Sequence, residues 1–362
     1  MDNSRRYKLL LLAVLLIVLL IEVPILYINL NPSVKEPVMP DQPDLIPFRV
    51  NIQEIQGELV WSIPKVTVGL PISQIQDLRE EKPSVLLVII VSSAPLRWER
   101  RKAIRQTWWK HCNVKEVACH FFTDGLVVNK TIQENLSNET SRYGDIEFQP
   151  LLGGIEFGMR FLYHAKWAAA NYDFQYFLRT DDDYFVCLKK LLNELPWRPK
   201  HNLCWGNFHC EVQMTWIDES WMLFSRDIID KFLNQDARTM LCHPHAGQQI
   251  GIWLNNISGR LFFHDVRLNH VRAFDWQARN VCVTYMGVHQ AFASRMLQLA
   301  KTSEDGAKTV PPISKFSSYC EYDTFDYRRL HDPYFYEPKP CVENAIWVKS
   351  HRMWLGEEGR IN

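Results

Sequence analysis

The sequence of 362 residues predicts an α/β domain that follows a transmembrane helix and a proline-rich stalk. Three observations carry this prediction: an apolar run near the N-terminus, a wholly aliphatic strand at Val85–Val91, and a second strand that leads into three aspartates. Basic and acidic residues balance at 41 each, which argues against a nucleic-acid-binding protein. Nine cysteines suit an oxidising compartment, and their odd number leaves at least one without an intramolecular partner.

Residues 9–30 are predicted to be a transmembrane signal anchor. Twelve of the thirteen residues from Leu9 to Ile21 are Leu, Ile or Val, worth about −4 to −7 kcal/mol of insertion free energy. This gain outweighs the cost of about 3 kcal/mol for Glu22. The alternative is a cleaved signal peptide, but no small-x-small cleavage signal follows Ile21. Because the basic residues precede the span, residues 1–8 form a cytoplasmic tail and the rest is luminal, as in a single-pass type II protein.

Four N-x-S/T sequons agree with a luminal placement, at Asn129, Asn135, Asn138 and Asn256. Three of them fall within 129–140, which predicts an exposed glycosylated loop.

Residues 31–82 contain seven prolines, which block continuous helix and sheet. We therefore predict an extended stalk, in which the mixed patch 48–70 could pack locally.

The run Val85–Val91 predicts a central strand buried on both faces of an α/β sheet. After a break at 92–95, residues 97–109 have helical periodicity. Arg97, Arg101 and Arg105 share one face of this helix, and the plain alternative is that they only solvate it.

A second unit consists of a helix at 157–170, a strand at 173–178, and the triplet Asp181, Asp182 and Asp183. In extended chain Asp181 and Asp183 point to one side and Asp182 to the other. That arrangement suits a divalent cation and the hydroxyls of a ligand. A solvated acidic turn is the alternative.

The motifs SVLLVIIVSSAP, ERRKAIRQTWW and YFLRTDDDYFV resemble the β-1,3-galactosyl- and β-1,3-N-acetylglucosaminyltransferases of glycosyltransferase family 31. The resemblance implies a single GT-A-type catalytic domain at 83–300, with a mixed, mainly parallel sheet. It also implies a Golgi membrane enzyme.

Carried over by position, the resemblance implies that Asp182 contacts the ribose of the nucleotide and that Asp183 binds a divalent metal, usually Mn²⁺. Asp181 would support both. Arg101 and Arg105 match the family's R-x-x-I-R pattern, as nucleotide-sugar-binding or structural residues. His289 matches a histidine that completes the metal shell, with a packed histidine as the alternative.

This chain departs from the family pattern at two further places. Glu219 and its neighbours replace the glycines of the family's GGGYVLSRDL segment, which implies a reshaped sugar pocket. Ala246-Gly247 replaces the Glu-Asp pair whose aspartate is taken as the catalytic base. His245 is our candidate substitute, as its ordinary pKa of about 6.5 suits a base.

Other readings of this segment remain open. Asp236 and Asp265 are further candidates for the base, and His245 could simply be a loop or core histidine. Cys242, His243 and His245 together could instead form a zinc site.

The tail at 301–362 is rich in Tyr and Phe, and we predict that it packs on the catalytic domain. Cys112–Cys119, Cys204–Cys210 and Cys320–Cys341 are plausible disulfides, although spacing does not determine connectivity.

The resemblance implies an inverting transferase that moves a hexose from a UDP-sugar to a glycan acceptor on a glycoprotein or glycolipid, forming a β-1,3 bond. Galactose is the first expectation for the donor and N-acetylhexosamine the second. The alternative is a non-catalytic relative that serves as a chaperone or partner subunit of an active glycosyltransferase.

Overall fold

The structure, a computed structural model, describes residues 52–55, 58–61, 82–125, 129–149, 157–211, 214–236, 239–243, 245–269, 281–303, 310–329, 338–340, 348–349 and 352–353. The predicted anchor at 9–30 lies outside these residues. Within them, no helix has the length and apolar character needed to cross a membrane.

The chain divides into two compact units, residues 1–62 and 63–362. In the first, β1 (Ile52–Ile55) and β2 (Glu58–Trp61) form an antiparallel hairpin. This hairpin lies within the predicted stalk, in the patch 48–70 for which local packing was a possibility from the sequence.

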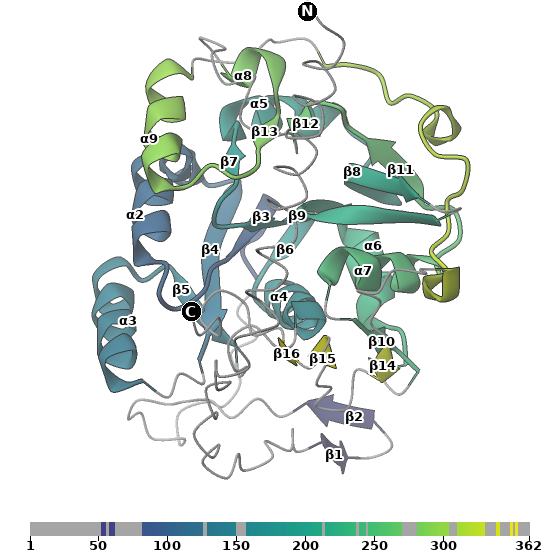
Figure 1. The fold of residues 1–362 in the computed structure, drawn as a ribbon, viewed down its shortest axis with the longest axis horizontal. Helices are drawn as coiled ribbons and strands as arrows, with labels where there is room; N and C mark the ends of the chain where they lie inside the picture. Colours follow the sequence, from purple (N-terminus) through teal and green to yellow (C-terminus); the bar gives the residue numbers. More distant parts are fainter. Residues whose placement is uncertain are drawn as a thin grey trace, which may run out of the picture. The chain divides into compact units, whose positions relative to one another are not determined.

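The second unit is built on a seven-stranded sheet in the order β11-β8-β9-β6-β3-β4-β5 (Figure 1). All neighbouring strands are parallel except that β9 runs antiparallel to both β6 and β8. The predicted α/β class with a mixed, mainly parallel sheet is therefore confirmed. The strands are β3 (Ser84–Ser92), β4 (Val117–Asp124), β5 (Ile146–Gln149), β6 (Asp173–Asp181), β8 (Leu203–Glu211), β9 (Met214–Ser225) and β11 (Leu261–His264).

The helices of this unit connect the strands. They are α2 (Trp98–Gln106), α3 (Lys130–Tyr143), α4 (Phe157–Asn171), α5 (Leu188–Glu194), α6 (Arg226–Leu233), α7 (Ala246–Leu254), α8 (Val281–Thr284) and α9 (Ala293–Thr302). Short 3₁₀ helices are η2 (Trp108–Cys112), η3 (Leu195–Trp197), η5 (Phe316–Ser318) and η6 (Tyr327–Arg329).

Minor strands complete the unit. They are β7 (Phe185–Val186), β10 (Leu241–Cys242), β12 (Leu268–Asn269), β13 (Gly287–Val288), β14 (Lys339–Pro340), β15 (Val348–Lys349) and β16 (Arg352–Met353). They pair as β12-β13-β7, β10-β14 and β15-β16.

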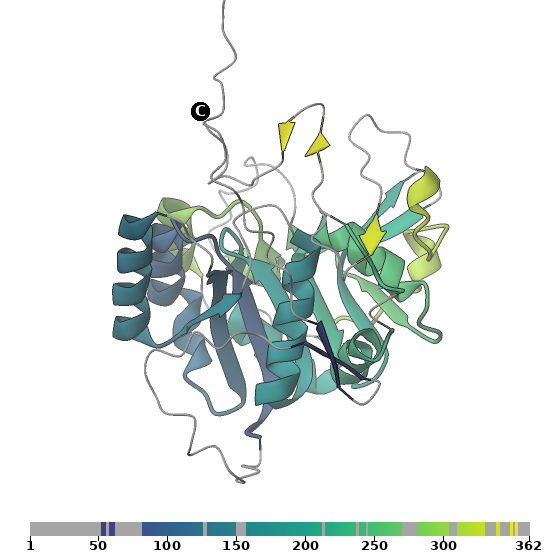
Figure 2. The same ribbon diagram turned by 90° about the horizontal axis from the view of Figure 1, so that it is seen from below.

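Apolar side chains on both faces of the sheet form the core. Leu87 and Ile89 of β3 belong to a buried cluster that includes residues of α2, α5 and α9. On the other side, Phe161 of α4 packs edge-on against Phe177 of β6 and Trp253 of α7. Figure 2 shows α4 running alongside the strands of the sheet. The burial of Val85–Val91 on both faces agrees with the prediction from its uninterrupted aliphatic sequence.

The segment with three sequons is a helix, so the prediction of a loop was wrong. Asn129 caps the N-terminus of α3 by accepting a hydrogen bond from the Ile132 amide, and Gly144 ends the helix in the left-handed conformation. Only Leu136 of this helix is buried, which is why its sequence resembles a surface loop. Asn135 and Asn138, like Asn129, are exposed.

Part of the C-terminal segment is described, and it packs against β8, β9 and α7. The Thr215 amide donates to the Thr324 carbonyl, and the Phe325 amide donates to Asn255 Oδ1. Phe325 is buried against Trp216.

Three disulfides lie within the described residues: Cys112–Cys119, Cys187–Cys282 and Cys210–Cys320. The first was predicted. The predicted bonds Cys204–Cys210 and Cys320–Cys341 were wrong, because Cys210 and Cys320 bond to each other and Cys204 is a buried free thiol.

Candidate active site

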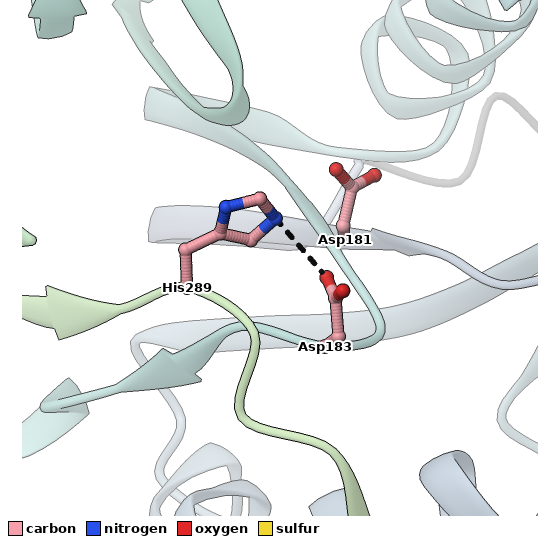
Figure 3. A group of neighbouring side chains, drawn as sticks. All are labelled: Asp181, Asp183 and His289. Carbon is pink, nitrogen blue, oxygen red and sulfur yellow. Dashed lines mark ion pairs between the residues drawn. The ribbon is translucent and has the colours of Figure 1, made fainter. Parts of the chain in front are cut away.

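Asp181, Asp183 and His289 meet at the carboxyl end of β6, and each offers one ligand atom within 4.8 Å of the others. His289 directly follows β13, and its Nε2 lies 3.5 Å from Asp183 Oδ1 (Figure 3). The Ala291 amide donates to the Asp183 carbonyl at 2.7 Å, which ties the two loops together. The structure therefore brings together Asp183 and His289, which were predicted as metal ligands, and Asp181, which was predicted to support the site.

The shifts in pKa in this cluster follow from its burial and its charges. Burial raises the pKa of Asp181, and the neighbouring Asp183 adds to the effect, while Arg179 opposes it. Burial also acts to raise the pKa of Asp183, but the hydrogen bond and charge of His289 lower it. His289 shows the reverse balance: burial acts to lower its pKa, and Asp183 raises it.

The donor set fits a divalent cation. Two carboxylates and an imidazole are ligands that such ions accept in proteins. A cation between Asp181 and Asp183 would relieve the repulsion between these carboxylates, which adds to the effect of burial on the pKa of Asp181. We conclude that the site is compatible with a divalent metal, whose identity the ligands alone do not fix.

Asp182 lies in the turn after β6 and is not part of this group of ligands, and it is completely buried. Its Oδ1 pairs with Arg100 at 2.8 Å and with Arg97 at 3.2 Å. Its Oδ2 is buried without a hydrogen-bond partner in the described part of the chain, an uncommon state for a carboxylate oxygen.

The arginines that reach the aspartates are not the ones chosen from the sequence. Arg101 is completely buried, where it bonds to Glu139 and to the carbonyls of Ala94 and Pro95. Arg105 bonds to Glu139 as well, and to Asp145. Arg101 thus holds the turn after β3, and Arg105 links α2 to Glu139 and Asp145. A role of these two arginines in nucleotide binding stays a prediction.

The cluster of Asp181, Asp183 and His289 lies beside a cleft of about 350 Å³. Asp181 and His289 line the cleft, and its other titratable lining residues are Asp218 and Glu219 of β9, His209 of β8 and His245. A cleft with this many titratable groups is typical of a catalytic site.

A bulge in β9 brings its acidic residues into the cleft. Between the pairs Gly206–Met222 and Phe208–Ile217, β9 has four residues, 218–221, against one residue of β8. Bulges of this kind redirect side chains beside functional sites.

Asp218 and His209 form a pair at this bulge that the sequence analysis missed. Asp218 Oδ2 lies 2.8 Å from His209 Nε2, and its Oδ1 accepts from the Ser220 amide at 2.9 Å. Burial acts to lower the pKa of His209, but the hydrogen bond and charge of Asp218 raise it. No sequence spacing signals this contact, because it depends on the register of β8 against β9.

The N-terminus of α7 occupies the place where the family pattern has Glu-Asp. The Ala246 amide donates to Glu219 Oε2 at 3.0 Å. A Cβ on Gly247 would lie only 2.1 Å from the Ile217 carbonyl oxygen, so this helix position has no room for a side chain. The carboxylate next to this helix end therefore comes from β9.

The remaining candidates for the base differ in position. His245 is the N-cap residue of α7 and lines the cleft, and its amide donates to His243 Nδ1 at 3.1 Å. Asp265 is buried elsewhere, where it accepts from Trp205 and Arg267. Asp236 follows α6 and is not among the described residues that line the cleft.

The alternative of a zinc site is wrong. Cys242 is disulfide-bonded, so its sulfur cannot serve as a thiolate ligand beside His243 and His245.

Residues 99–220 match the family model described as galactosyltransferase. Beta-1,3-galactosyltransferase 6 of Mus musculus is 23% identical over 245 residues, which cover 60% of this chain and 73% of the relative. Lactosylceramide 1,3-N-acetyl-beta-D-glucosaminyltransferase of Mus musculus is 31% identical over 121 residues, 31% of this chain and 32% of the relative. The matches to three further relatives span only 18% to 30% of their lengths.

Among solved structures, an active-site mutant of LgtC matches with a TM-score of 0.35 and 13% identity, covering 62% of this chain and 97% of that one. A likeness this distant carries no argument about function.

Proposed function

Because its residues 99–220 place this chain in glycosyltransferase family 31, as its motifs predicted, we propose that it transfers a hexose from a UDP-sugar to a glycan acceptor. The bond formed is a β-1,3 linkage, with inversion at the anomeric carbon. Galactose is the first choice of donor, because the matching family and the first relative are galactosyltransferases. N-acetylhexosamine is the second, since other relatives are named for N-acetylglucosaminyl or N-acetylgalactosaminyl transfer.

The observation that carries this proposal is the cluster of Asp181, Asp183 and His289 at the edge of the cleft. Departure of UDP leaves negative charge on a diphosphate, and a divalent cation would neutralise that charge without a proton transfer. We propose Mn²⁺ as this cation, held by Asp183 and His289 with Asp181. Asp182 is proposed to face the ribose, a role that its buried oxygen without a partner supports.

The proposed location is the Golgi membrane, with residues 9–30 as the anchor of a single-pass type II protein. The acceptor would be a glycan on a glycoprotein or glycolipid. The charge pattern of the N-terminus supports this placement, as do the exposed side chains of Asn129, Asn135, Asn138 and Asn256.

The test is turnover of the full chain purified in detergent. UDP release would be measured with UDP-galactose, UDP-N-acetylglucosamine and UDP-N-acetylgalactosamine, each with and without Mn²⁺ and a panel of β-linked galactoside and hexosaminide acceptors. We expect acceptor-dependent UDP release with one donor, abolished by a chelator. Binding of UDP and Mn²⁺ without turnover on any acceptor would overturn the catalytic assignment.

A non-catalytic role as a chaperone or partner subunit is the second candidate. The observation that favours it is Gly247, which packs so closely against β9 that no carboxylate fits at the expected position of the base. This non-catalytic role would be supported if the chain bound UDP and Mn²⁺ but turned over no donor.

A further inference from the structure

Transfer to a hydroxyl requires a group that accepts the hydroxyl proton as the new bond forms. Gly247 has no side chain for this task, and its contact with Ile217 excludes one. We propose that Glu219 of β9 is the catalytic base. This inference rests on the proposed transferase function, and it concerns a residue that the family pattern does not assign.

The backbone of β9 fixes Glu219 relative to the metal cluster. Thr180, which precedes Asp181, donates from its hydroxyl to the Ser220 carbonyl at 2.7 Å. Arg179 donates to the Glu219 carbonyl through Nη1 and pairs with Asp181 through Nη2. The backbone of Glu219 is thus held to the strand that carries Asp181. A catalytic group that is fixed in this way accelerates a reaction more than a mobile one does.

The side chain of Glu219 is held at one oxygen. Its Oε2 accepts from the Ala246 amide at the N-terminus of α7, where the helix dipole favours a negative charge. Among the described residues no donor contacts its Oε1, although Glu219 lines the cleft together with Asp181 and His289. One carboxylate oxygen is therefore fixed, while the other remains for a substrate hydroxyl.

The other acidic and basic groups of the cleft are less suited. Both oxygens of Asp218 already accept hydrogen bonds, one from Ser220 and one in the pair with His209. His209 is engaged through its Nε2, which lies 2.8 Å from Asp218 Oδ2. His245, the candidate from the sequence, is the N-cap residue of α7. The carbonyls of Glu219 and Ser220 instead accept hydrogen bonds from side chains of β6, the strand that carries Asp181.

The proposed step balances as follows. The acceptor hydroxyl gives its proton to Glu219, and its oxygen forms a bond to the anomeric carbon of the donor sugar. The bond between that carbon and the β-phosphate oxygen breaks, and its electron pair leaves with UDP. Glu219 then releases the proton to solvent, so that the products are the extended glycan, UDP and a proton.

The test is Glu219→Gln in the full chain. Glutamine keeps the shape of the side chain and an oxygen for the Ala246 amide, but it cannot take the proton. We expect kcat to fall by about 10²-fold or more, while KM for the donor and Mn²⁺-dependent UDP binding stay within about twofold of wild type. Glu134→Gln, an exposed glutamate on α3, is the matched control and should keep full turnover.

The outcomes separate this inference from the proposed function. If the wild type turns over and Glu219→Gln keeps its kcat, Glu219 is not the base. In that case His245→Gln and His209→Gln, measured alongside, show which group is. If Glu219→Gln loses UDP binding together with kcat, Glu219 holds the donor site and the assignment as base is overturned. If the wild type has no turnover with any donor, the proposed function fails, and a catalytic role for Glu219 fails with it.

Discussion

Gly247 at the first turn of α7 lies directly against the backbone of Ile217 in β9, with 2.1 Å between the Ile217 carbonyl oxygen and the place of a Cβ on Gly247. This contact sets the distance between the helix and the bulged strand that carries Asp218 and Glu219. It also means that the base expected at this position cannot be restored by adding a carboxylate there.

We predict that Gly247→Ala lowers the free energy of unfolding by about 2–3 kcal/mol, because the methyl group must displace backbone. Gly247→Asp should lower the free energy of unfolding by at least the same amount, and it should not raise turnover. Urea unfolding of both variants measures the effect. Gly259→Ala is the control: a Cβ there meets nothing within 4 Å, so only the positive φ of 69° costs stability, about 1 kcal/mol. Equal stability of Gly247→Ala and wild type would contradict the packing of α7 on β9.

The Glu139 carboxylate neutralises Arg101, which is completely buried beneath the turn after β3. We predict that Glu139→Gln lowers the free energy of unfolding by about 3 kcal/mol, because it removes one partner of a buried ion pair. Burial acts to raise the pKa of Glu139, but hydrogen bonds from Arg101 and Arg105 lower it below the usual value.

The sign of the pH dependence follows from that lowered pKa. A carboxyl group whose pKa is lower in the folded state stabilises the fold above its unfolded pKa, and the contribution disappears as the pH falls through the folded pKa. The difference between wild type and Glu139→Gln should therefore be complete at pH 7 and shrink in acid below about pH 4. A difference that is the same at pH 7 and pH 3 would argue against the ion pair.

The exposed sequon residues predict N-linked glycans on a chain made in secretory cells. Glycosidase digestion should lower the apparent mass, and Asn→Gln changes at Asn129, Asn135, Asn138 and Asn256 should remove the shift together. Asn129→Gln should also cost about 1 kcal/mol of stability, since Asn129 caps α3. An unchanged mass after digestion of the wild type would contradict the luminal placement.

The parts of the fold that were predictable have strong local patterns. The aliphatic run Val85–Val91 became β3, and the helix predicted at 157–170 became α4. Asp181 is the last residue of β6, whereas Asp182 and Asp183 lie in the turn that follows, so strand alternation does not set the directions of their side chains.

The partners of charged side chains were not predictable in the same way. Arg97 and Arg105 share one helix face by periodicity, yet Arg97 pairs with Asp182 and Arg105 with Glu139. From the sequence, Glu219 was notable only because it replaces a glycine of the family pattern. Its contact with the Ala246 amide depends on how β9 and α7 pack, which no local pattern in the sequence records.

The central claim is that Asp181, Asp183 and His289 hold the cation that binds a UDP-sugar, and calorimetric titration of the full chain with UDP tests it most directly. We predict that UDP binds with Mn²⁺ present and that a chelator removes the binding. Asp183→Asn should weaken it at least tenfold, or about 1.4 kcal/mol. The control is Asp173→Asn, an exposed aspartate at the other end of β6, which should bind like wild type. UDP affinity that is the same with and without Mn²⁺, or unchanged in Asp183→Asn, would contradict the account.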